Sequence, residues 1–94
     1  MKLTIRDTRE RLAAMLADRQ SRRELARCQL SARERTILHF RFFHGLTRRQ
    51  TAESLKITID QVRSVEMRAL RQVRRFFEML DAVAMAGTDG ETFA

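Results

Sequence analysis

The stretch 48–67 reads RRQTAESLKITIDQVRSVEM, and it decides how the rest of the chain can fold. A helix-turn-helix needs a short first helix, a turn of three or four residues, and a second helix held at a steep angle, so that its outer face can enter the major groove of DNA. Small and aliphatic side chains stand where two such helices would meet: Ala52, Leu55, Ile57, Val62 and Val65. The spacing therefore predicts a helix-turn-helix in this stretch.

Two residues fit this motif less well than the others. Thr51 stands where an aliphatic side chain would pack better between the helices. Lys56 stands in the turn, where glycine adopts an unusual backbone conformation most easily because it has no Cβ atom. We therefore expect an imperfect version of the motif at these two positions.

Four pairs of residues have the spacing of a helix-capping box, in which a Ser or Thr and a Glu or Gln three residues later satisfy each other's free backbone N–H. They are Ser21/Glu24, Ser31/Glu34, Thr47/Gln50 and Thr58/Gln61. The chain has no proline, and Gly45 falls where a glycine would end a helix. These signals predict helices over four ranges: about 6–28, with a bend or restart at Ser21, and about 32–44, 48–55 and 59–84.

The predicted fold class is all-α, a domain of four to five helices that ends in the helix-turn-helix. Ninety-four residues are too few for two independent cores. We expect a helical extension over residues 1–29, the helix-turn-helix domain over 30–86 and a disordered tail over 87–94. The longest apolar run has six residues, far too few to span a membrane, so we expect a cytoplasmic protein without membrane contact.

The last predicted helix has two distinct faces when residues are placed at 100° of rotation each. The apolar stripe expected to face the core contains Val62, Val65, Ala69, Val73, Phe76, Leu80 and Val83. The opposite face carries Asp60, Ser64, Met67, Arg71 and Arg74, with Arg63, Arg68 and Arg75 on its shoulders. Because arginine donates hydrogen bonds in a planar fork that suits phosphate oxygens, this face predicts a helix beside nucleic acid. A solvated basic face without a partner is the alternative.

The net charge is concentrated in the same part of the chain. The chain has a formal charge of +7, from 19 Lys and Arg residues against 12 Asp and Glu residues. Residues 33–75 hold 11 cations and four anions and so account for the whole net charge, because residues 1–32 and 76–94 carry +4 and −4. Such a local excess favours an anionic partner, and we expect double-stranded DNA.

Residue types that serve catalysis or metal binding are not grouped in this sequence. Cys28 is the one cysteine, and His39 and His44 lie five residues apart, which points them to different sides of a helix. A structural zinc site needs three or four clustered ligands. We therefore expect no enzyme activity, no metal ion and no cofactor.

Three segments of the chain carry a resemblance to a known family: LSARERTILHFRF (30–42), LTRRQTAESLKIT (46–58) and VRSVEMRALRQVR (62–74). Together they resemble region 4 of bacterial sigma-70-type sigma factors. The segment 66–71 is closer to that family than to the related LuxR-type module. The short link 45–47, however, resembles both the compact region 4 of extracytoplasmic-function sigma factors and LuxR-type domains. The resemblance implies a four-helix domain, in a bacterial or phage-infected cell. It would bind the upstream promoter element through its last helix and the flap of the RNA polymerase β subunit through an apolar groove.

Several positions of the family's motif can be carried over to this chain. The resemblance implies phosphate contacts for Arg33 and Arg41, a backbone contact for Arg63 and a capping role for Thr58. It also implies that Arg68 and Arg71 match basic positions that neighbouring activators touch.

The base-reading positions depart from the family. Primary sigma factors carry Arg, Glu, Arg and, three residues later, Gln, where this chain has Ile59, Asp60, Gln61 and Ser64. Two arginines that could hold guanine bidentately are missing, and each such pair is worth about 1–3 kcal/mol of discrimination. We therefore do not expect recognition of the usual upstream element. Nothing in these residues resembles region 2, which holds the polymerase clamp and melts the promoter.

The first functional hypothesis is a small transcription regulator that binds DNA. Its phosphate contacts would be Arg33, Arg41, Arg48, Arg49, Arg63, Arg68 and Arg71. Three residues would face the bases, namely Asp60, Gln61 and Ser64. In this hypothesis Gln61 pairs with adenine and Asp60 accepts a hydrogen bond from cytosine.

The second hypothesis is a protein-interaction module that binds RNA polymerase or a sigma factor without reading DNA. Its interaction residues would be Leu12, Leu16, an exposed Met67 and Arg71. The stripe with Leu12 and Leu16 can cover the core or dock on a partner, and covering the core is the commoner arrangement in small domains. One half of a split sigma factor, and a homodimer through the N-terminal helix, are further alternatives.

Overall fold

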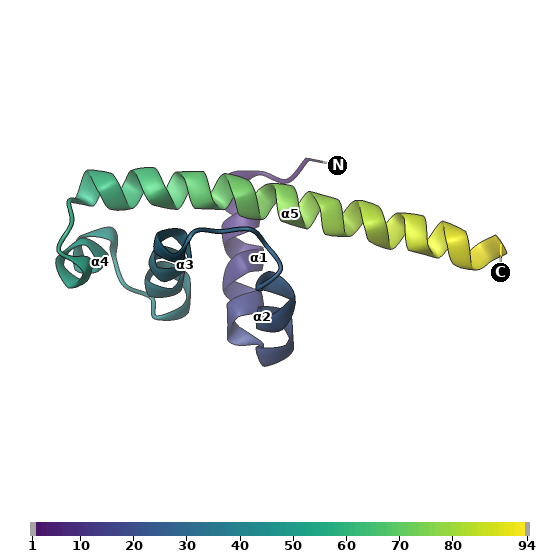
Figure 1. Ribbon diagram of the computed structural model, residues 1–94, viewed down its shortest axis with the longest axis horizontal. Coiled ribbons are helices and arrows are strands. Elements are labelled where there is room, and N and C mark those ends of the chain that lie inside the picture. The colour runs from purple at the N-terminus through teal and green to yellow at the C-terminus, as the bar shows by residue number, and fades with distance from the viewer. Residues whose placement is uncertain (1, 94) are drawn as a thin grey trace.

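The computed structural model describes residues 2–93, with side chains up to residue 85. The elements are α1 (Ile5–Ala17), α2 (Arg19–Leu25), α3 (Ala32–Leu38), the π-helix η1 (His39–Phe43), α4 (Arg48–Leu55) and α5 (Ile59–Phe93). Helix α5 runs the length of the molecule, α1 crosses it at a steep angle, and α2, α3 and α4 lie along one side of it (Figure 1). The all-α prediction is confirmed for the described residues.

Capping boxes set most of the helix starts. The predicted boxes Ser31/Glu34, Thr47/Gln50 and Thr58/Gln61 all form both reciprocal hydrogen bonds, at 2.8–3.1 Å. A further box that the sequence analysis did not identify, Thr4/Asp7, begins α1. Local spacing therefore predicts where α3, α4 and α5 begin.

The predicted box at Ser21 and Glu24 is wrong. The N-terminal helix breaks at Asp18, whose carboxylate accepts hydrogen bonds from the Ser21 amide at 2.9 Å and from the Ser21 hydroxyl at 2.7 Å. These hydrogen bonds from Ser21 lower the pKa of Asp18 below its ordinary value. Asp18 is therefore the N-cap of α2, and the predicted helix over 6–28 is two helices that meet at this residue.

The predicted helix over 32–44 changes its winding after Leu38. The range His39–Phe43 forms one π-helical turn, closed by a 3.0 Å hydrogen bond from the His44 amide to the carbonyl of the first residue of that turn. Such wider turns are rare and occur mostly as single insertions in α-helices. Gly45 follows with a φ of 69°, which confirms the predicted helix-ending glycine.

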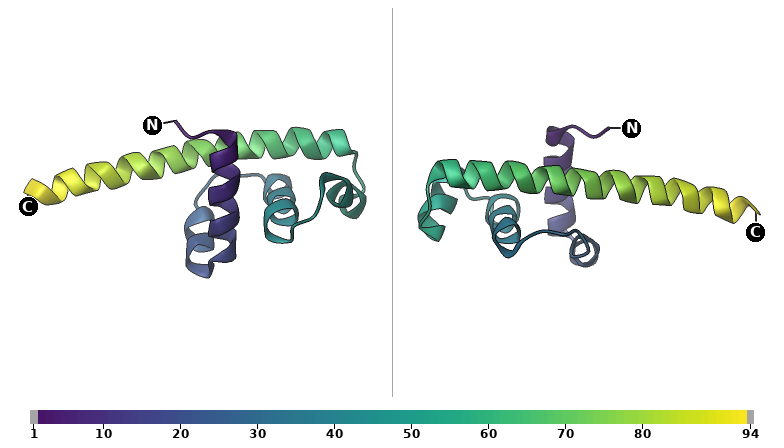
Figure 2. Two further views of the ribbon diagram at one scale, coloured as in Figure 1. Left: turned by 180° about the vertical axis from the view of Figure 1, so that it is seen from behind. Right: turned by 45° about the horizontal axis from the view of Figure 1, so that its top comes forward.

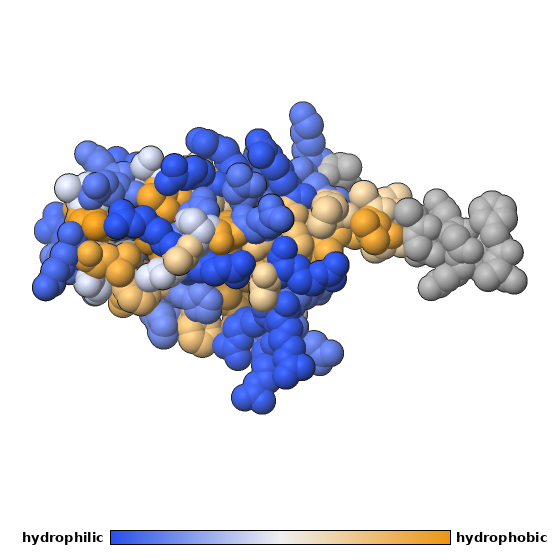
Figure 3. Space-filling model, viewed as in Figure 1, coloured by the Kyte–Doolittle hydropathy of each residue, from blue (hydrophilic) through white to orange (hydrophobic). Residues whose placement is uncertain are grey.

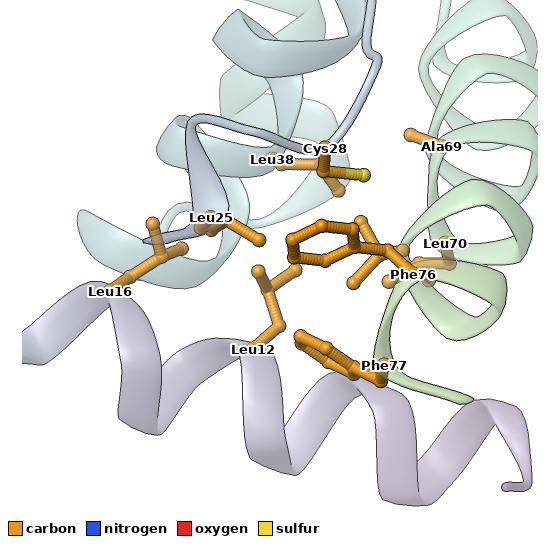
Figure 4. Packing of buried hydrophobic residues seen from close by; sticks show 10 residues of the cluster. Leu12, Leu16, Leu25, Cys28, Leu38, Ala69, Leu70, Phe76 and Phe77 are labelled. Carbon is orange, nitrogen blue, oxygen red and sulfur yellow. The ribbon is translucent and has the colours of Figure 1, made fainter. Parts of the chain in front are cut away.

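Two clusters of buried side chains hold the helices together. The larger cluster joins α1, α2, α3 and α5 and contains Leu12, Leu16, Leu25, Cys28, Leu38, Ala69, Leu70, Val73, Phe76 and Phe77 (Figure 4). The smaller cluster lies inside the helix-turn-helix and contains Ile37, Ala52, Val62 and Val65. Leu12 and Leu16 are completely buried, so the expectation that their stripe covers the core is confirmed. Their assignment as protein-interaction residues is wrong, because the other side chains of the larger cluster already cover them.

The buried face of α5 is wider than the predicted stripe. The predicted core positions Val62, Val65, Ala69, Val73 and Phe76 are buried, whereas Leu80 is half-buried and Val83 is mostly exposed. Glu66, Leu70 and Phe77 are completely buried as well, although they lie outside the predicted stripe. Helix α5 packs on α1 as well as on α3 and α4, and this additional neighbour covers a second arc of its surface.

Helix α5 also extends beyond its predicted end near residue 84. Its backbone is helical as far as Phe93, over residues for which the sequence analysis predicts a disordered tail. Each interior glycine costs about 1 kcal/mol of helix propensity, but no proline stops the helix. The molecule is consequently elongated, at 54 × 25 × 20 Å, and the end of α5 projects beyond the other helices (Figure 2). The division of the chain into three domains stays a prediction.

The two residues that were expected to fit the helix-turn-helix less well, Lys56 and Thr51, do so in the structure. Lys56 ends α4 in the left-handed conformation, with φ of 57°, which costs a residue with a Cβ atom about 1–2 kcal/mol. Thr51 is completely buried, and its hydroxyl has no hydrogen-bond partner among the described atoms. A buried hydroxyl without a partner costs stability because it has lost its bonds to water.

Replacing Thr51 with valine is therefore expected to raise the free energy of unfolding by about 1 kcal/mol, because a methyl group of similar size replaces the unpaired hydroxyl. The melting temperature should rise by about 4–8 °C. Thr51→Ser is the matched control, since it keeps the hydroxyl and loses the methyl group, and it should be less stable than the wild type. Thermal unfolding followed by far-UV circular dichroism measures all three proteins. A valine variant less stable than the wild type would show that the hydroxyl has a partner.

Candidate nucleic-acid interface

The start of α5 presents three polar side chains to solvent. The turn before it is closed by hydrogen bonds from the amides of Lys56 and Ile57 to carbonyl groups of α4, at 3.3 and 3.0 Å. Asp60, Gln61 and Ser64 then follow in the first turns of α5, and all three are exposed. The structure thus brings the predicted base-facing residues together at the exposed end of the second helix of the motif.

Two of these three side chains have partners within the chain. The Gln61 Oε1 atom accepts the Thr58 amide at 2.9 Å, as part of the capping box. Bidentate pairing with adenine uses both the oxygen and the nitrogen of an amide side chain, so Gln61 can offer adenine only its NH₂ group in this conformation. The Asp60 carboxylate lies 3.3 Å from the Arg63 guanidinium, an exposed pair of small energetic value.

A buried carboxylate lies behind this surface. Glu66 on α5 is 0% exposed and accepts hydrogen bonds from Arg41 Nε at 2.5 Å and from Arg48 Nη2 at 2.9 Å. Arg41 also donates through Nη1 to the Leu46 carbonyl at 2.7 Å. The cluster therefore ties η1, α4 and the link between them to α5, which fixes the angle between the two helices of the motif.

Burial alone raises the pKa of Glu66, because desolvation penalises the charged carboxylate. The hydrogen bonds from Arg48 and Arg41, together with their positive charges, outweigh this effect and hold the pKa below its ordinary value. Glu66 is therefore ionised at neutral pH. This role of Glu66 was not predicted from the sequence, although its position four residues after Val62 and four before Leu70 places it on the buried face of the helix.

The seven predicted phosphate contacts fall into three groups. Arg41 and Arg48 are bound to Glu66, and their side chains are only 21% and 30% exposed. The more exposed Arg63 and Arg68 each lie near one carboxylate, Asp60 at 3.3 Å and Glu34 at 3.7 Å respectively. The side chains of the third group are exposed and form no hydrogen bond or ion pair within the described part of the chain: Arg33, Arg49 and Arg71. This third group, from α3, α4 and α5, is the best placed to bind phosphate.

Met67 is half-buried, contrary to the expectation of an exposed side chain. It packs against the larger core cluster, and its sulfur atom lies 3.9 Å from Arg9 Nη2 of α1. Arg9 therefore covers part of the surface on which Met67 was expected to meet a partner. Arg71 is exposed, as the interaction hypothesis requires.

The fold and the basic surface define the chain as a helix-turn-helix protein of the DNA-binding class. A family model described as "Sigma-70, region 4" matches residues 28–75. The chain belongs to this family, which is regulatory and not catalytic, and α1 and α2 lie outside the match. Searches among curated proteins and among solved structures found no match. Within the described residues, no helix combines the length and the apolar character needed to cross a membrane.

Proposed function

We propose that this chain is a small transcription regulator that binds double-stranded DNA and contacts RNA polymerase. The observation that carries the proposal is the group Arg33, Arg49 and Arg71, three exposed guanidinium groups from three helices, none of them neutralised by a described side chain. Contacts to phosphate supply most of the affinity of such proteins and fix their position on the duplex. Arg63 and Arg68 add positive charge to the same domain.

We infer that sequence selectivity is weaker than, or different from, that of primary sigma factors. No arginine occupies the base-reading positions, and the Gln61 amide oxygen is engaged by the Thr58 amide. The remaining groups able to meet base edges are the Asp60 carboxylate, the Ser64 hydroxyl and the Gln61 NH₂ group. Affinity should therefore depend on phosphate contacts more than on the sequence of the duplex.

A pair of double variants tests which arginines meet DNA. Arg49→Ala/Arg71→Ala removes two positive charges from the proposed interface, and Arg19→Ala/Arg23→Ala removes two from exposed positions of α2. For the first variant, the plot of log association constant against log salt concentration should become less steep, its slope shrinking in magnitude by about two. The affinity should drop by about tenfold or more. For the α2 variant both quantities should stay close to the wild-type values.

Fluorescence anisotropy with a labelled duplex of about 25 base pairs measures both quantities. Equal losses for the two double variants would mean that only the total charge matters. An unchanged affinity for Arg49→Ala/Arg71→Ala would place the DNA on another surface. Either outcome would contradict the proposed interface.

A protein-interaction module is the second candidate function. A shallow groove of about 220 Å³ between α3 and the end of α4 has an apolar floor, and it is lined by Ala32, Arg33, Thr36, Leu55 and Ile57. Binding of a polymerase helix there would bury apolar surface and tolerate salt better than phosphate contacts do. Purified RNA polymerase retained by the immobilised chain after nuclease treatment and a high-salt wash would support this function, and its loss would favour DNA as the primary partner.

A further inference from the structure

A groove with an apolar floor lies between α5 and the segment after α2. It has a volume of about 310 Å³, and its apolar lining residues are Cys28, Phe76 and Met79. Cys28 and Phe76 are 3% and 7% exposed and form the floor, whereas Met79 is 50% exposed. Burial raises the pKa of the Cys28 thiol, so the floor carries no charge at neutral pH.

The rim of this groove is polar and contains no acidic residue. Its four members are exposed, and their side chains form no hydrogen bond or ion pair within the described part of the chain: Arg27, Gln29, Gln72 and Arg75. Glu78 follows Arg75 by three residues but is engaged elsewhere, since its carboxylate accepts the Leu3 amide at 3.1 Å. The rim therefore offers two guanidinium groups and two amide groups to an anionic partner.

Apolar surface continues from the groove along α5. Val83 lies four residues after Met79, and therefore on the same face of the helix, and it is 61% exposed. In this part of the chain α5 projects beyond the other helices (Figures 1 and 2), and Figure 3 shows apolar surface on it. From Gln72 to Val83 the face is about 16 Å long, which matches about three turns of a partner helix.

The groove needs residues that lie outside the matched family domain. The family match covers residues 28–75, so that Arg27, Phe76, Met79 and Val83 are additional to it. The groove also lies away from the proposed base-reading end of α5, because Arg75 follows Asp60 by about 22 Å along the helix. A partner bound in the groove would therefore leave that end of α5 uncovered.

We propose that the groove binds an acidic amphipathic helix of a partner protein. The apolar side chains of the partner would cover Phe76, Met79 and Val83, and two of its carboxylates would bind Arg27 and Arg75. An apolar centre inside a polar rim is the usual arrangement of protein interfaces, and arginine binds carboxylates with paired hydrogen bonds. Duplex DNA suits the groove less well, because its phosphate backbone offers no apolar surface to cover Met79 and Val83.

Fluorescence anisotropy with a labelled peptide of about 14 residues tests this proposal. The peptide has leucine at every third or fourth position, glutamate on both sides of the leucine line and alanine elsewhere, so that it forms an amphipathic helix of about 20 Å. The full chain should bind it with a dissociation constant of about 10–100 µM, because the contact is smaller than a standard interface. The same peptide with lysine in place of glutamate should bind at least about tenfold more weakly. Equal affinity for the two peptides, or no binding of the glutamate peptide up to about 1 mM, would overturn the proposal.

Two double variants show whether the basic rim is the binding site. Arg27→Ala/Arg75→Ala should raise the dissociation constant of the glutamate peptide by at least about fivefold, because it removes both charged partners. Arg19→Ala/Arg23→Ala, with the same loss of charge at exposed positions of α2, should change it by less than about twofold. Equal effects would mean that only the total charge matters, and the proposal would fail. It would fail as well if the first variant lost as much affinity for a duplex as is expected for the variant of the proposed DNA interface, since the groove would then bind DNA.

Two exposed methionines of α5 test the apolar part of the groove. Met79→Asp should weaken peptide binding by at least about tenfold, because it places a carboxylate beside the apolar and acidic side chains of the peptide. Met85→Asp adds the same charge on another face of the helix and should stay within about twofold of the wild type. Similar losses for the two variants would contradict binding in the groove. The peptide measurements are made without DNA, so a negative result leaves the proposed DNA binding unaffected.

Discussion

Replacing Glu66 with alanine is expected to lower the free energy of unfolding by about 3–5 kcal/mol, the range for removing one partner of a buried ion pair. The change leaves two arginines, Arg41 and Arg48, side by side without the carboxylate that both bind. Since these groups connect η1 and α4 to α5, the angle within the helix-turn-helix should loosen as well. Urea unfolding followed by circular dichroism measures the loss.

The matched control for this variant is Glu53→Ala, the same chemical change at an exposed position of α4. It should alter stability by no more than about 0.5 kcal/mol. A loss for Glu66→Ala as small as that for Glu53→Ala would show that the buried cluster does not hold the helices of the motif together.

The same carboxylate makes stability depend on pH. Burial raises the pKa of Glu66, but the bonds from Arg48 and Arg41 bring it below the ordinary value. The stabilisation is therefore complete above the unfolded-state pKa of about 4.3, and it is lost as the pH falls through the folded-state pKa. The stability difference between the wild type and Glu66→Gln should consequently shrink on acidification from about pH 5 to pH 3. A constant difference over this window would contradict the lowered pKa.

Replacing Phe77 with alanine is expected to cost about 3–5 kcal/mol, the range for truncating a fully buried aromatic side chain. Phe77 belongs to the same cluster as Leu12 and Leu16 of α1, and the Arg11 guanidinium lies 4.4 Å from the centre of its ring. The variant therefore opens a cavity and also removes a contact between α1 and α5. Chemical unfolding gives the size of the effect.

Hydrogen exchange shows whether α1 depends on this contact. The amides of α1 should lose protection in Phe77→Ala and keep it in Met85→Ala, a control on the exposed part of the same helix. Unchanged protection of α1 in the Phe77 variant would mean that the N-terminal helices form an independent arm. That result would restore Leu12 and Leu16 as candidates for a partner surface.

The helix-turn-helix could be predicted from the sequence because its signals are local. Each capping box depends on two residues three positions apart, and Ser31, Thr47 and Thr58 all begin helices as predicted. The strained conformation of Lys56 also follows from its place at the turn. The break in the N-terminal helix was predicted at Ser21, three residues too late. Asp and Ser are both good N-cap residues, and in the structure it is the Asp18 carboxylate that accepts the Ser21 amide, at 2.9 Å.

The candidate site was harder to predict because it depends on contacts between distant residues. Arg41 and Arg48 are arginines like any others in the sequence, and only the fold brings them to Glu66. Periodicity likewise predicts which residues share a face of α5, but it does not show where the covering helices end, so Val83 was placed in the core. The positive charges could therefore be counted from the sequence, but only the structure shows which of the arginines are free to contact DNA.

The most direct test of DNA binding is the affinity of the wild-type chain for a duplex, measured at several salt concentrations. If three to five arginines meet phosphates, the affinity should fall about 40- to 500-fold between about 50 and 200 mM salt, since each contact adds about 0.9 to the slope. Binding to DNA with such a slope is the result we expect. No affinity for any duplex at about 50 mM salt, or an affinity that does not change with salt, would contradict a DNA-binding function for this surface.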